Sequence, residues 1–237
     1  MTFGDYITQY GYTVMCCLSI VVTVFFVGAY ASKFSLSFKR GCLYALITYA
    51  LCIAAVYVWK EIDRIMTGSG SLTSSKIVFL VPIFSVALSS FFGVSGMRSI
   101  DYYAPTFYLA RGICKIGCLC QGCCLGREWS WGIYDPIIRG YAFPMPLFEA
   151  IGCFAIMGFA IIMNKRMNYC GNGRVYAYAM IIFGVFRYCI EFTSRSEIVV
   201  WLINESQIYA AVMLLCGLVG LYLIEKIEAK NNSYSIP

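Results

Sequence analysis

The feature of this 237-residue chain that most limits its fold is a series of long apolar stretches with almost no charge in them. A helix that crosses the hydrocarbon core of a membrane needs about 20 predominantly apolar residues. Only helices and closed barrels can cross it, and the stretches lack the period-2 alternation of barrel strands. We therefore expect helical spans at residues 6–32, 41–59, 77–97, 104–125, 140–164, 175–186 and 206–224.

Composition excludes several classes of protein. Only 13% of the residues are charged, whereas a soluble domain carries about 25%. The net charge of +6 comes from scattered residues, which form no basic stripe for nucleic acid. The expected fold class is an all-α, polytopic membrane helix bundle of about seven transmembrane helices. It forms one transmembrane domain over residues 1–237, with a frayed tail at 231–237.

The loops predict the orientation in the membrane. Basic residues gather at 33–40, at 165–174 and after the last span at 226–230. Because cytoplasmic loops carry an excess of Lys and Arg, we expect the N-terminus outside and the C-terminus in the cytoplasm. That orientation needs an odd number of spans, which supports counting 104–125 although it contains two charges.

Ionisable residues inside the expected spans are the main indication of function. A charge at the bilayer centre costs about 2.5–3.5 kcal/mol on insertion scales, so such residues usually face the bundle interior and have a partner. The alternative is that they lie at headgroup depth and reach lipid phosphates. The candidates are Arg111, Lys115, Glu149, Arg187, Glu191 and Arg195.

The spacing of these residues predicts two clusters. Arg111 and Lys115 are four residues apart, so a helix places both cations on one face. They repel unless an anion lies between them, and phosphate is a natural anion for Arg and Lys. Arg187, Glu191 and Arg195 repeat at the same interval and predict one stripe of alternating charge. We expect Arg187 and Glu191 to contact each other or a shared anion inside the bundle.

The chain contains no histidine. This excludes a Ser–His–Asp triad, a Cys–His dyad and a catalytic metal held by histidine. Any proton acceptor must be an Asp, Glu, Lys, Tyr or Cys side chain.

Five of the thirteen cysteines cluster in the pattern C-x3-C-x-C-x2-C-C. A metal or iron–sulfur site is one interpretation, and close packing of small residues between helices is the other. Paired C-x2-C motifs are missing, and a helix that puts the first two cysteines on one face points the third elsewhere. We therefore expect no bound metal. The five are Cys114, Cys118, Cys120, Cys123 and Cys124.

A set of motifs runs in order along the chain. Residues 113–126 read ICKIGCLCQGCCLG, residues 143–150 read FPMPLFEA, and residues 184–192 read GVFRYCIEF. Tyr10-Gly11 precedes them, GRVYAY lies at 173–178, and Gln207 follows. Together they resemble the bacterial prolipoprotein diacylglyceryl transferase family, with its glycine-rich signature and its P-S-Q-L-Y-E-A and G-x-x-R-x-x-x-E-F motifs.

The resemblance implies a reaction at the bacterial plasma membrane, with no cofactor. The diacylglyceryl group of phosphatidylglycerol moves to the thiol of the lipobox cysteine in the signal peptide of a prelipoprotein. A thioether forms and glycerol phosphate leaves. The implied partners are therefore phosphatidylglycerol, the prelipoprotein and the membrane, and not nucleic acid.

On this interpretation the charged residues hold the phosphate. Arg187 clamps it, Lys115 adds a point charge, and Glu191 keeps Arg187 in place. Glu149 is the candidate base, or it orients Arg187 or Arg195. Glycines let backbone or lipid approach closely. The further residues expected to bind substrate are Tyr10, Arg111, Arg195, Gly117 and Gly126.

The chain departs from the family in two places. The family's His-Gly-Gly motif has no counterpart in residues 77–93, and its signature arginine is Lys115. The alternative function is a repurposed or inactive relative that binds phospholipid or a lipidated peptide. A small transporter or channel is a third interpretation, against which the lack of an inverted repeat argues.

Overall fold

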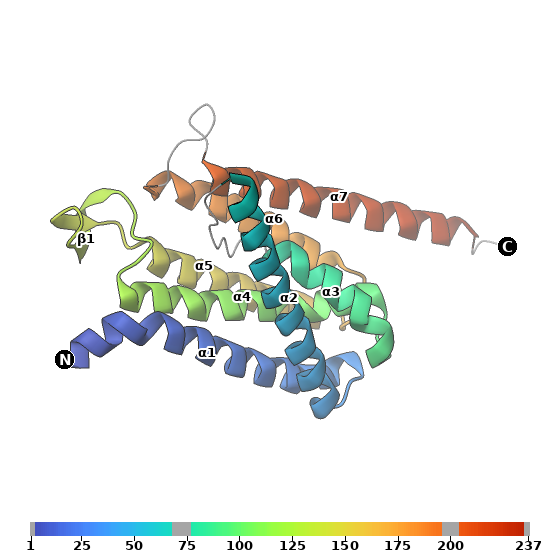
Figure 1. The fold of residues 1–237 in the computed structure, drawn as a ribbon. Helices are drawn as coiled ribbons and strands as arrows, with labels where there is room; N and C mark the ends of the chain where they lie inside the picture. The colour runs from blue at the N-terminus through green and yellow to red at the C-terminus, as the bar shows by residue number, and fades with distance from the viewer. Residues whose placement is uncertain (1–2, 68–76, 196–203, 235–237) are drawn as a thin grey trace.

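The structure is a computed structural model and describes residues 3–67, 77–195 and 204–234. These residues form seven α-helices, two short 3-10 turns and a two-stranded hairpin (Figure 1). The elements are α1 (Phe3–Ala31), η1 (Ser32–Phe34), α2 (Phe38–Thr67), α3 (Ile77–Phe92), α4 (Gly96–Gln121), β1 (Glu128–Asp135), β2 (Gly140–Ala142), α5 (Met145–Arg166), α6 (Arg174–Ile190), η3 (Glu191–Thr193) and α7 (Glu205–Tyr234).

The chain is a multi-pass membrane protein built from helices. In the described part of the chain, α1, α2, α5, α6 and α7 are long and apolar enough to cross a membrane. Helix α3 has only 16 residues, fewer than the 20 or so that a span needs. Helix α4 carries charged side chains along much of its length. Each expected span overlaps one of the seven helices along most of its length, while the seven-span count stays a prediction.

Some of the expected helix boundaries are wrong. Helix α3 ends at Phe92, and Gly93 follows in the left-handed conformation with φ of 72°. Helix α4 then begins at Gly96, so the end of the expected span 77–97 belongs to the next helix. Helix α7 continues to Tyr234, through the first part of the segment expected to be frayed, and residues 235–237 lie outside the described part.

The hairpin replaces what was expected to be the start of a span at residue 140. Strands β1 and β2 pair antiparallel, with Asp135 opposite Gly140 and Tyr134 opposite Tyr141. Pro144 is the N-cap of α5 and Pro146 lies in its first turn, where the N–H that proline lacks has no helical partner anyway. The charge-free stretch therefore begins as a strand, and α5 starts at Met145.

Helix α4 is the centre of the bundle and packs against α1, α3, α5 and α6 (Figure 1). Tyr102 and Tyr103 of this helix bury their aromatic rings in the core while their hydroxyls find partners. Tyr102 donates to the carbonyl of Val27 at 2.7 Å, and Tyr103 donates to Oγ1 of Thr48 at 3.0 Å. These bonds tie α4 to α1 and α2.

A buried carboxylate joins α4 to the start of α6. Asp101 accepts hydrogen bonds from the backbone N–H groups of Gly173 at 2.8 Å and Tyr176 at 3.0 Å. The first N–H groups of a helix have no partner within it, so Asp101 acts as an N-cap supplied by another helix. This contact fixes the direction of α6 and therefore where its far end lies.

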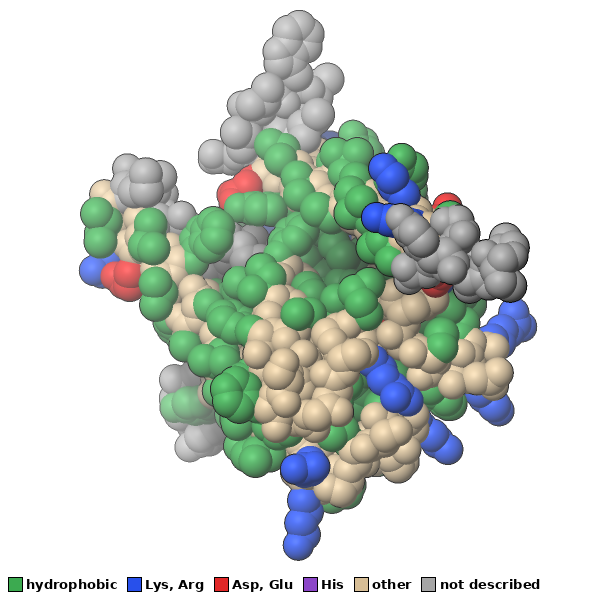
Figure 2. All heavy atoms as spheres, turned by 90° about the vertical axis from the view of Figure 1, so that its right-hand side faces the viewer, with side chains coloured by type: hydrophobic (Ala, Val, Ile, Leu, Met, Phe, Trp, Pro, Cys, Tyr) green, Lys and Arg blue, Asp and Glu red, His purple; other side chains and the backbone are tan. Residues whose placement is uncertain are grey.

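Basic side chains gather around one end of the bundle. Figure 2 shows this end, with Lys and Arg at its rim and few acidic side chains. The C-terminus and the connection between α1 and α2 lie there, and the hairpin and the N-terminus lie at the opposite end (Figure 1). The bundle therefore has one strongly basic end.

Candidate functional site

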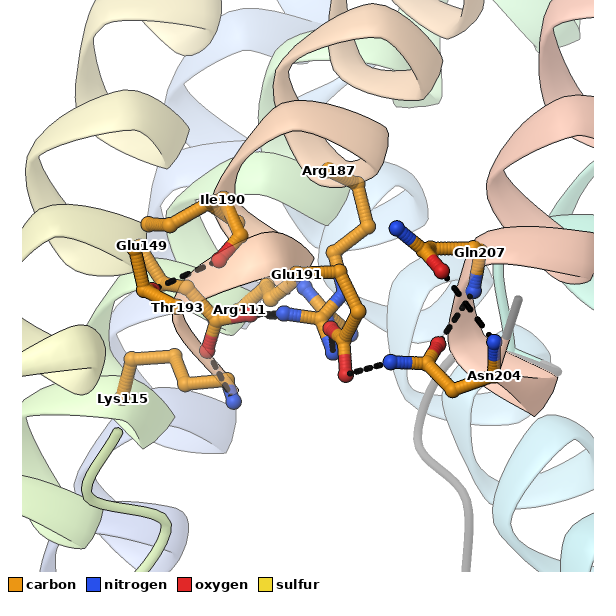
Figure 3. A network of polar contacts seen from close by, with 9 residues as sticks. All are labelled: Arg111, Lys115, Glu149, Arg187, Ile190, Glu191, Thr193, Asn204 and Gln207. Carbon is orange, nitrogen blue, oxygen red and sulfur yellow. Dashed lines mark hydrogen bonds and ion pairs between the residues drawn. The ribbon is translucent and has the colours of Figure 1, made fainter. Parts of the chain in front are cut away.

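Helices α4, α5 and α6 and the turn η3 bring charged side chains together, and the start of α7 lies beside them (Figure 3). Lys115 lies near the end of α4, Glu149 in the first turn or so of α5, and Arg187 in the last turn of α6. Helices α4, α5, α6 and α7 pack in succession. Because α5, α6 and α7 alternate in direction, the end of α6 meets the starts of α5 and α7.

Glu149 is the centre of this ion cluster. Its side chain is 2% exposed, and its two oxygens pair with Arg187 Nη1 and with Lys115 Nζ. Arg111 Nη2 lies 3.9 Å from Oε1 of the same carboxylate. The anion expected between Arg111 and Lys115 is therefore present, and in this structure it is a carboxylate from α5.

A second carboxylate holds the other side of Arg187. Glu191 Oε2 lies 2.6 Å from Arg187 Nη2, which confirms the expected contact inside the bundle. Asn204 Nδ2 donates to Glu191 Oε1 at 3.2 Å. Arg187 is thus held between two carboxylates, and its Nε is buried with no hydrogen-bond partner among the described residues.

Asn204 is a site residue that was not predicted from the sequence. Asn204 Oδ1 accepts from the backbone N–H of Gln207 at 2.9 Å, and Gln207 Oε1 accepts from the backbone N–H of Asn204 at 3.1 Å. This reciprocal pair is a capping box. The pattern Asn-x-x-Gln at the start of α7 was visible in the sequence and would have predicted it.

Arg195 does not belong to the expected charge stripe. Helix α6 ends at Ile190, so the interval of four residues no longer applies at 195. Arg195 Nη1 instead lies 2.6 Å from Asp135 Oδ2 of β1, and its Nε donates to the carbonyl of Gly126. Glu149 therefore does not orient Arg195, which ties the hairpin to the end of α6.

Asp135 was also not predicted. Trp129, Trp131 and Ile133 alternate along the chain and the turn signal Asp135-Pro136 follows, a pattern that would have indicated the hairpin. The backbone N–H of Ile137 donates to Asp135 Oδ1 at 2.8 Å. This hydrogen bond and the ion pair with Arg195 hold the pKa of the Asp135 carboxyl below its usual value. Asp135 is thus a charged anchor for the hairpin at neutral pH.

A pocket of about 260 Å³ opens beside the ion cluster. Three of its side chains are cations and one is a carboxylate. The lining residues are Lys115, Cys124, Leu125, Met145, Arg187, Glu191, Ser194, Arg195 and Ser206. A small anionic group is the natural ligand for a pocket of this composition.

The expected glycines have structural positions, and Tyr10 lies apart. A Cβ on Gly117 would lie 2.9 Å from the Cβ of Met15, so this glycine lets α1 pack closely on α4. The backbone N–H of Gly126 donates to Phe143 at 2.9 Å. Tyr10 is about half exposed on α1. It is not one of the described residues that line the pocket.

Three cysteine sulfurs meet at the end of α4, which the spacing did not predict. The Sγ atoms of Cys118, Cys123 and Cys124 all lie within 4.8 Å of one another. Gly122 ends the helix in the left-handed conformation, and Cys123 N–H donates back to Cys118 O at 3.0 Å. The spacing along one helix predicted that Cys118 shares a face with Cys114, because helical spacing takes no account of the turn that follows α4.

Comparison with known proteins identifies a family and several relatives. A family model described as prolipoprotein diacylglyceryl transferase matches residues 4–223. A protein of Streptococcus pyogenes serotype M5 (strain Manfredo), named phosphatidylglycerol–prolipoprotein diacylglyceryl transferase, is 24% identical over 248 aligned positions, which cover 93% of this chain and 92% of that protein.

Two clostridial relatives match over shorter segments. Phosphatidylglycerol–prolipoprotein diacylglyceryl transferase 2 of Clostridium perfringens (strain 13 / Type A) is 29% identical over 141 residues, 56% of this chain and 54% of that protein. The transferase of Clostridium tetani (strain Massachusetts / E88) is 27% identical over 103 residues, 40% of this chain and 41% of that protein. The matched segments thus span about half the length of these two relatives.

Proposed function

The chain belongs to the prolipoprotein diacylglyceryl transferase family, and we propose on that premise that it transfers a diacylglyceryl group from phosphatidylglycerol to the lipobox cysteine of a prelipoprotein. The relatives carry this activity in their names. The products are a thioether on the prelipoprotein and free glycerol phosphate. The expected location is the bacterial plasma membrane.

The observation that carries the proposal is the ion cluster around Glu149. It holds three cations, Arg111, Lys115 and Arg187, against the two carboxylates Glu149 and Glu191, a net charge of +1. Arg187 keeps one buried donor, Nε, without a partner among the described residues. A phosphate at the pocket supplies both the missing negative charge and the missing acceptor.

The reaction needs the positive charge of the cluster when the leaving group departs. The thiolate of the acceptor cysteine attacks the diacylglyceryl carbon bonded to the phosphate oxygen. The C–S bond forms, the C–O bond breaks, and the electron pair leaves with glycerol phosphate. Fixed cations in a site that excludes water stabilise the negative charge that develops on the leaving group. Arg187 and Lys115 are the residues we assign to this role.

Glu149 acts in this proposal as a positioning residue. Both of its oxygens are engaged by cations, so it holds Arg187 and Lys115 toward the pocket. That arrangement favours the orienting role over the role of a general base. Glu191 supports Arg187 from the opposite side.

The orientation in the membrane follows the same proposal. The basic end in Figure 2 lies in the cytoplasm, which puts the site and the hairpin at the outer face with the N-terminus. Helices α3 and α4 then complete seven spans. Secreted prelipoproteins reach this face, so acceptor and donor lipid meet at the pocket.

Complementation tests the proposed function. A strain depleted of its own transferase grows when it expresses this chain and does not grow with Arg187→Ala, while Arg187→Lys restores little growth because it lacks the planar fork. Arg64→Ala is the matched control, since Arg64 is 65% exposed in a surface ion pair. Failure of the wild-type chain to support growth, although it is present in the membrane, contradicts the proposal.

A repurposed phospholipid-binding relative is the second candidate, favoured by the absence of histidine from the chain. It predicts that the purified protein binds phosphatidylglycerol, that Arg187→Ala weakens this binding, and that no peptide is modified. A lipobox peptide incubated with protein and lipid separates the two, because only the transferase adds mass to it.

A further inference from the structure

The three-cysteine cluster lies directly beside the proposed phosphate site and has no role in it. Cys124 and Lys115 line the same pocket. Cys118 is buried, Cys123 is half-buried and Cys124 is exposed. The cluster therefore reaches from the packed end of α4 to the open pocket.

The backbone holds the three thiols in place before any ligand arrives. Gly122, with φ of 67°, ends α4, and its N–H donates to Leu119 O at 3.1 Å. Together with the bond from Cys123 N–H to Cys118 O this is a Schellman motif. Cys124 also has a positive φ, of 60°. Such a conformation is uncommon outside glycine.

The spacing of the sulfurs suits a metal. Zinc binds thiolates at about 2.3 Å, so two sulfurs on one tetrahedral zinc lie about 3.8 Å apart. The three Sγ atoms already lie within 4.8 Å of one another. Side-chain rotations that move the sulfur atoms by less than about 1 Å bring all three within bonding distance of one ion.

Cationic side chains lie beside the cluster. Lys115 and Arg187 line the same pocket as Cys124, and nearby positive charge stabilises a thiolate. The thiolate is the form that binds metals.

We propose that Cys118, Cys123 and Cys124 bind one zinc ion, or a similar thiophilic divalent cation, with the fourth coordination position open to the pocket. Three protein ligands and one open position are typical of catalytic zinc sites, whereas structural sites are closed by four. This departs from the expectation of no metal, which rested on cysteine spacing within a helix.

The open position has a use that rests on the proposed transferase function. The acceptor thiol coordinates there, its proton leaves to water as the Zn–S bond forms, and the sulfur becomes a thiolate beside the phosphate. A thiol coordinated to zinc is deprotonated outright. The metal thus takes over activation of the nucleophile in a chain without histidine.

Zinc loading without substrate tests the site. The protein is purified under a phosphine reductant, stripped with a chelator, dialysed against zinc and washed, and its zinc content is measured. We expect about one zinc per chain in the wild type and in the control Cys120→Ser, whose sulfur lies outside the cluster. The triple variant with Cys118→Ser, Cys123→Ser and Cys124→Ser should retain less than about a tenth of this.

Two further measurements complete the test. Cobalt in place of zinc should give a thiolate-to-cobalt charge-transfer band, and Cys124→Ser should weaken this band. Because Cys124 is exposed, this single variant keeps the test usable even if the triple variant does not fold. Wild-type protein without zinc after loading, or equal zinc in wild type and a folded triple variant, overturns the proposal. Zinc binding without peptide modification supports the metal site and contradicts the transferase function. Full transfer by metal-free protein supports the transferase function and contradicts the role of the metal.

Discussion

Replacing Glu149 by glutamine is the sharpest perturbation of the ion cluster. Glu149→Gln keeps the shape of the side chain and removes its charge. Of the five charged side chains in the cluster, Glu191 is then the remaining carboxylate, and it faces the three cations Arg111, Lys115 and Arg187. The net charge of the cluster rises from +1 to +2. Every one of these cations is buried or nearly so.

The magnitude follows from the burial of the carboxylate. Removing one partner of a buried ion pair costs about 3–5 kcal/mol, because it leaves an uncompensated charge. In a chain of this length 1 kcal/mol shifts Tm by about 2–4 °C, so we expect a fall of roughly 6–20 °C. The assay is thermal unfolding of the purified protein in detergent.

Glu61→Gln is the matched control. Glu61 is 49% exposed and pairs with Arg64 at 2.8 Å on the surface of α2. An exposed pair contributes about 0–1 kcal/mol, so the same substitution there should shift Tm by no more than about 4 °C. A fall at Glu149 no larger than at Glu61 refutes the reasoning.

A lipid arm links this prediction to the phosphate site. Phosphatidylglycerol should raise the Tm of Glu149→Gln by more than it raises that of the wild type, because its phosphate replaces the missing negative charge. A zwitterionic phospholipid should not distinguish the two proteins. Equal shifts with phosphatidylglycerol contradict the assignment of the phosphate to this cluster.

Three further predictions concern other residues. Lys115→Arg should preserve peptide modification and lipid binding, and Lys115→Met should lose both while the protein stays folded; transfer by Lys115→Met at the wild-type rate in a peptide assay sinks the assignment. The lowered pKa of Asp135 means that its ion pair with Arg195 stabilises the hairpin above pH of about 4 and is lost as pH falls below it. Fluorine NMR of fluorotryptophan-labelled protein should show the hairpin loosening on acidification, and Asp135→Asn should abolish that transition. Arg40→Cys should be inaccessible to an impermeant thiol reagent in whole cells, and peptide mapping that finds it labelled contradicts the proposed topology.

The sequence predicted the helices well because their signal is local. Each expected span overlaps one helix along most of its length, and the contact between Arg187 and Glu191 joins residues four positions apart. Both follow from periodicity and charge along a single segment.

What the sequence could not predict depends on how segments meet. Glu149 pairs with side chains from α4 and α6, and no spacing within one helix indicates that. Arg195 was misplaced because the helical interval was extended past the end of α6 at Ile190. The cysteine cluster depends on the turn at Gly122, which folds the chain back onto its own helix.

The most direct measurement of the central claim is a cell-free transfer reaction. Purified protein in phosphatidylglycerol vesicles is incubated with a lipobox peptide, and mass spectrometry of the peptide is combined with quantification of glycerol phosphate. The account predicts that each modified peptide gains one diacylglyceryl group on its cysteine and that one glycerol phosphate is released with it. A folded protein that binds phosphatidylglycerol and leaves the peptide unmodified contradicts the account.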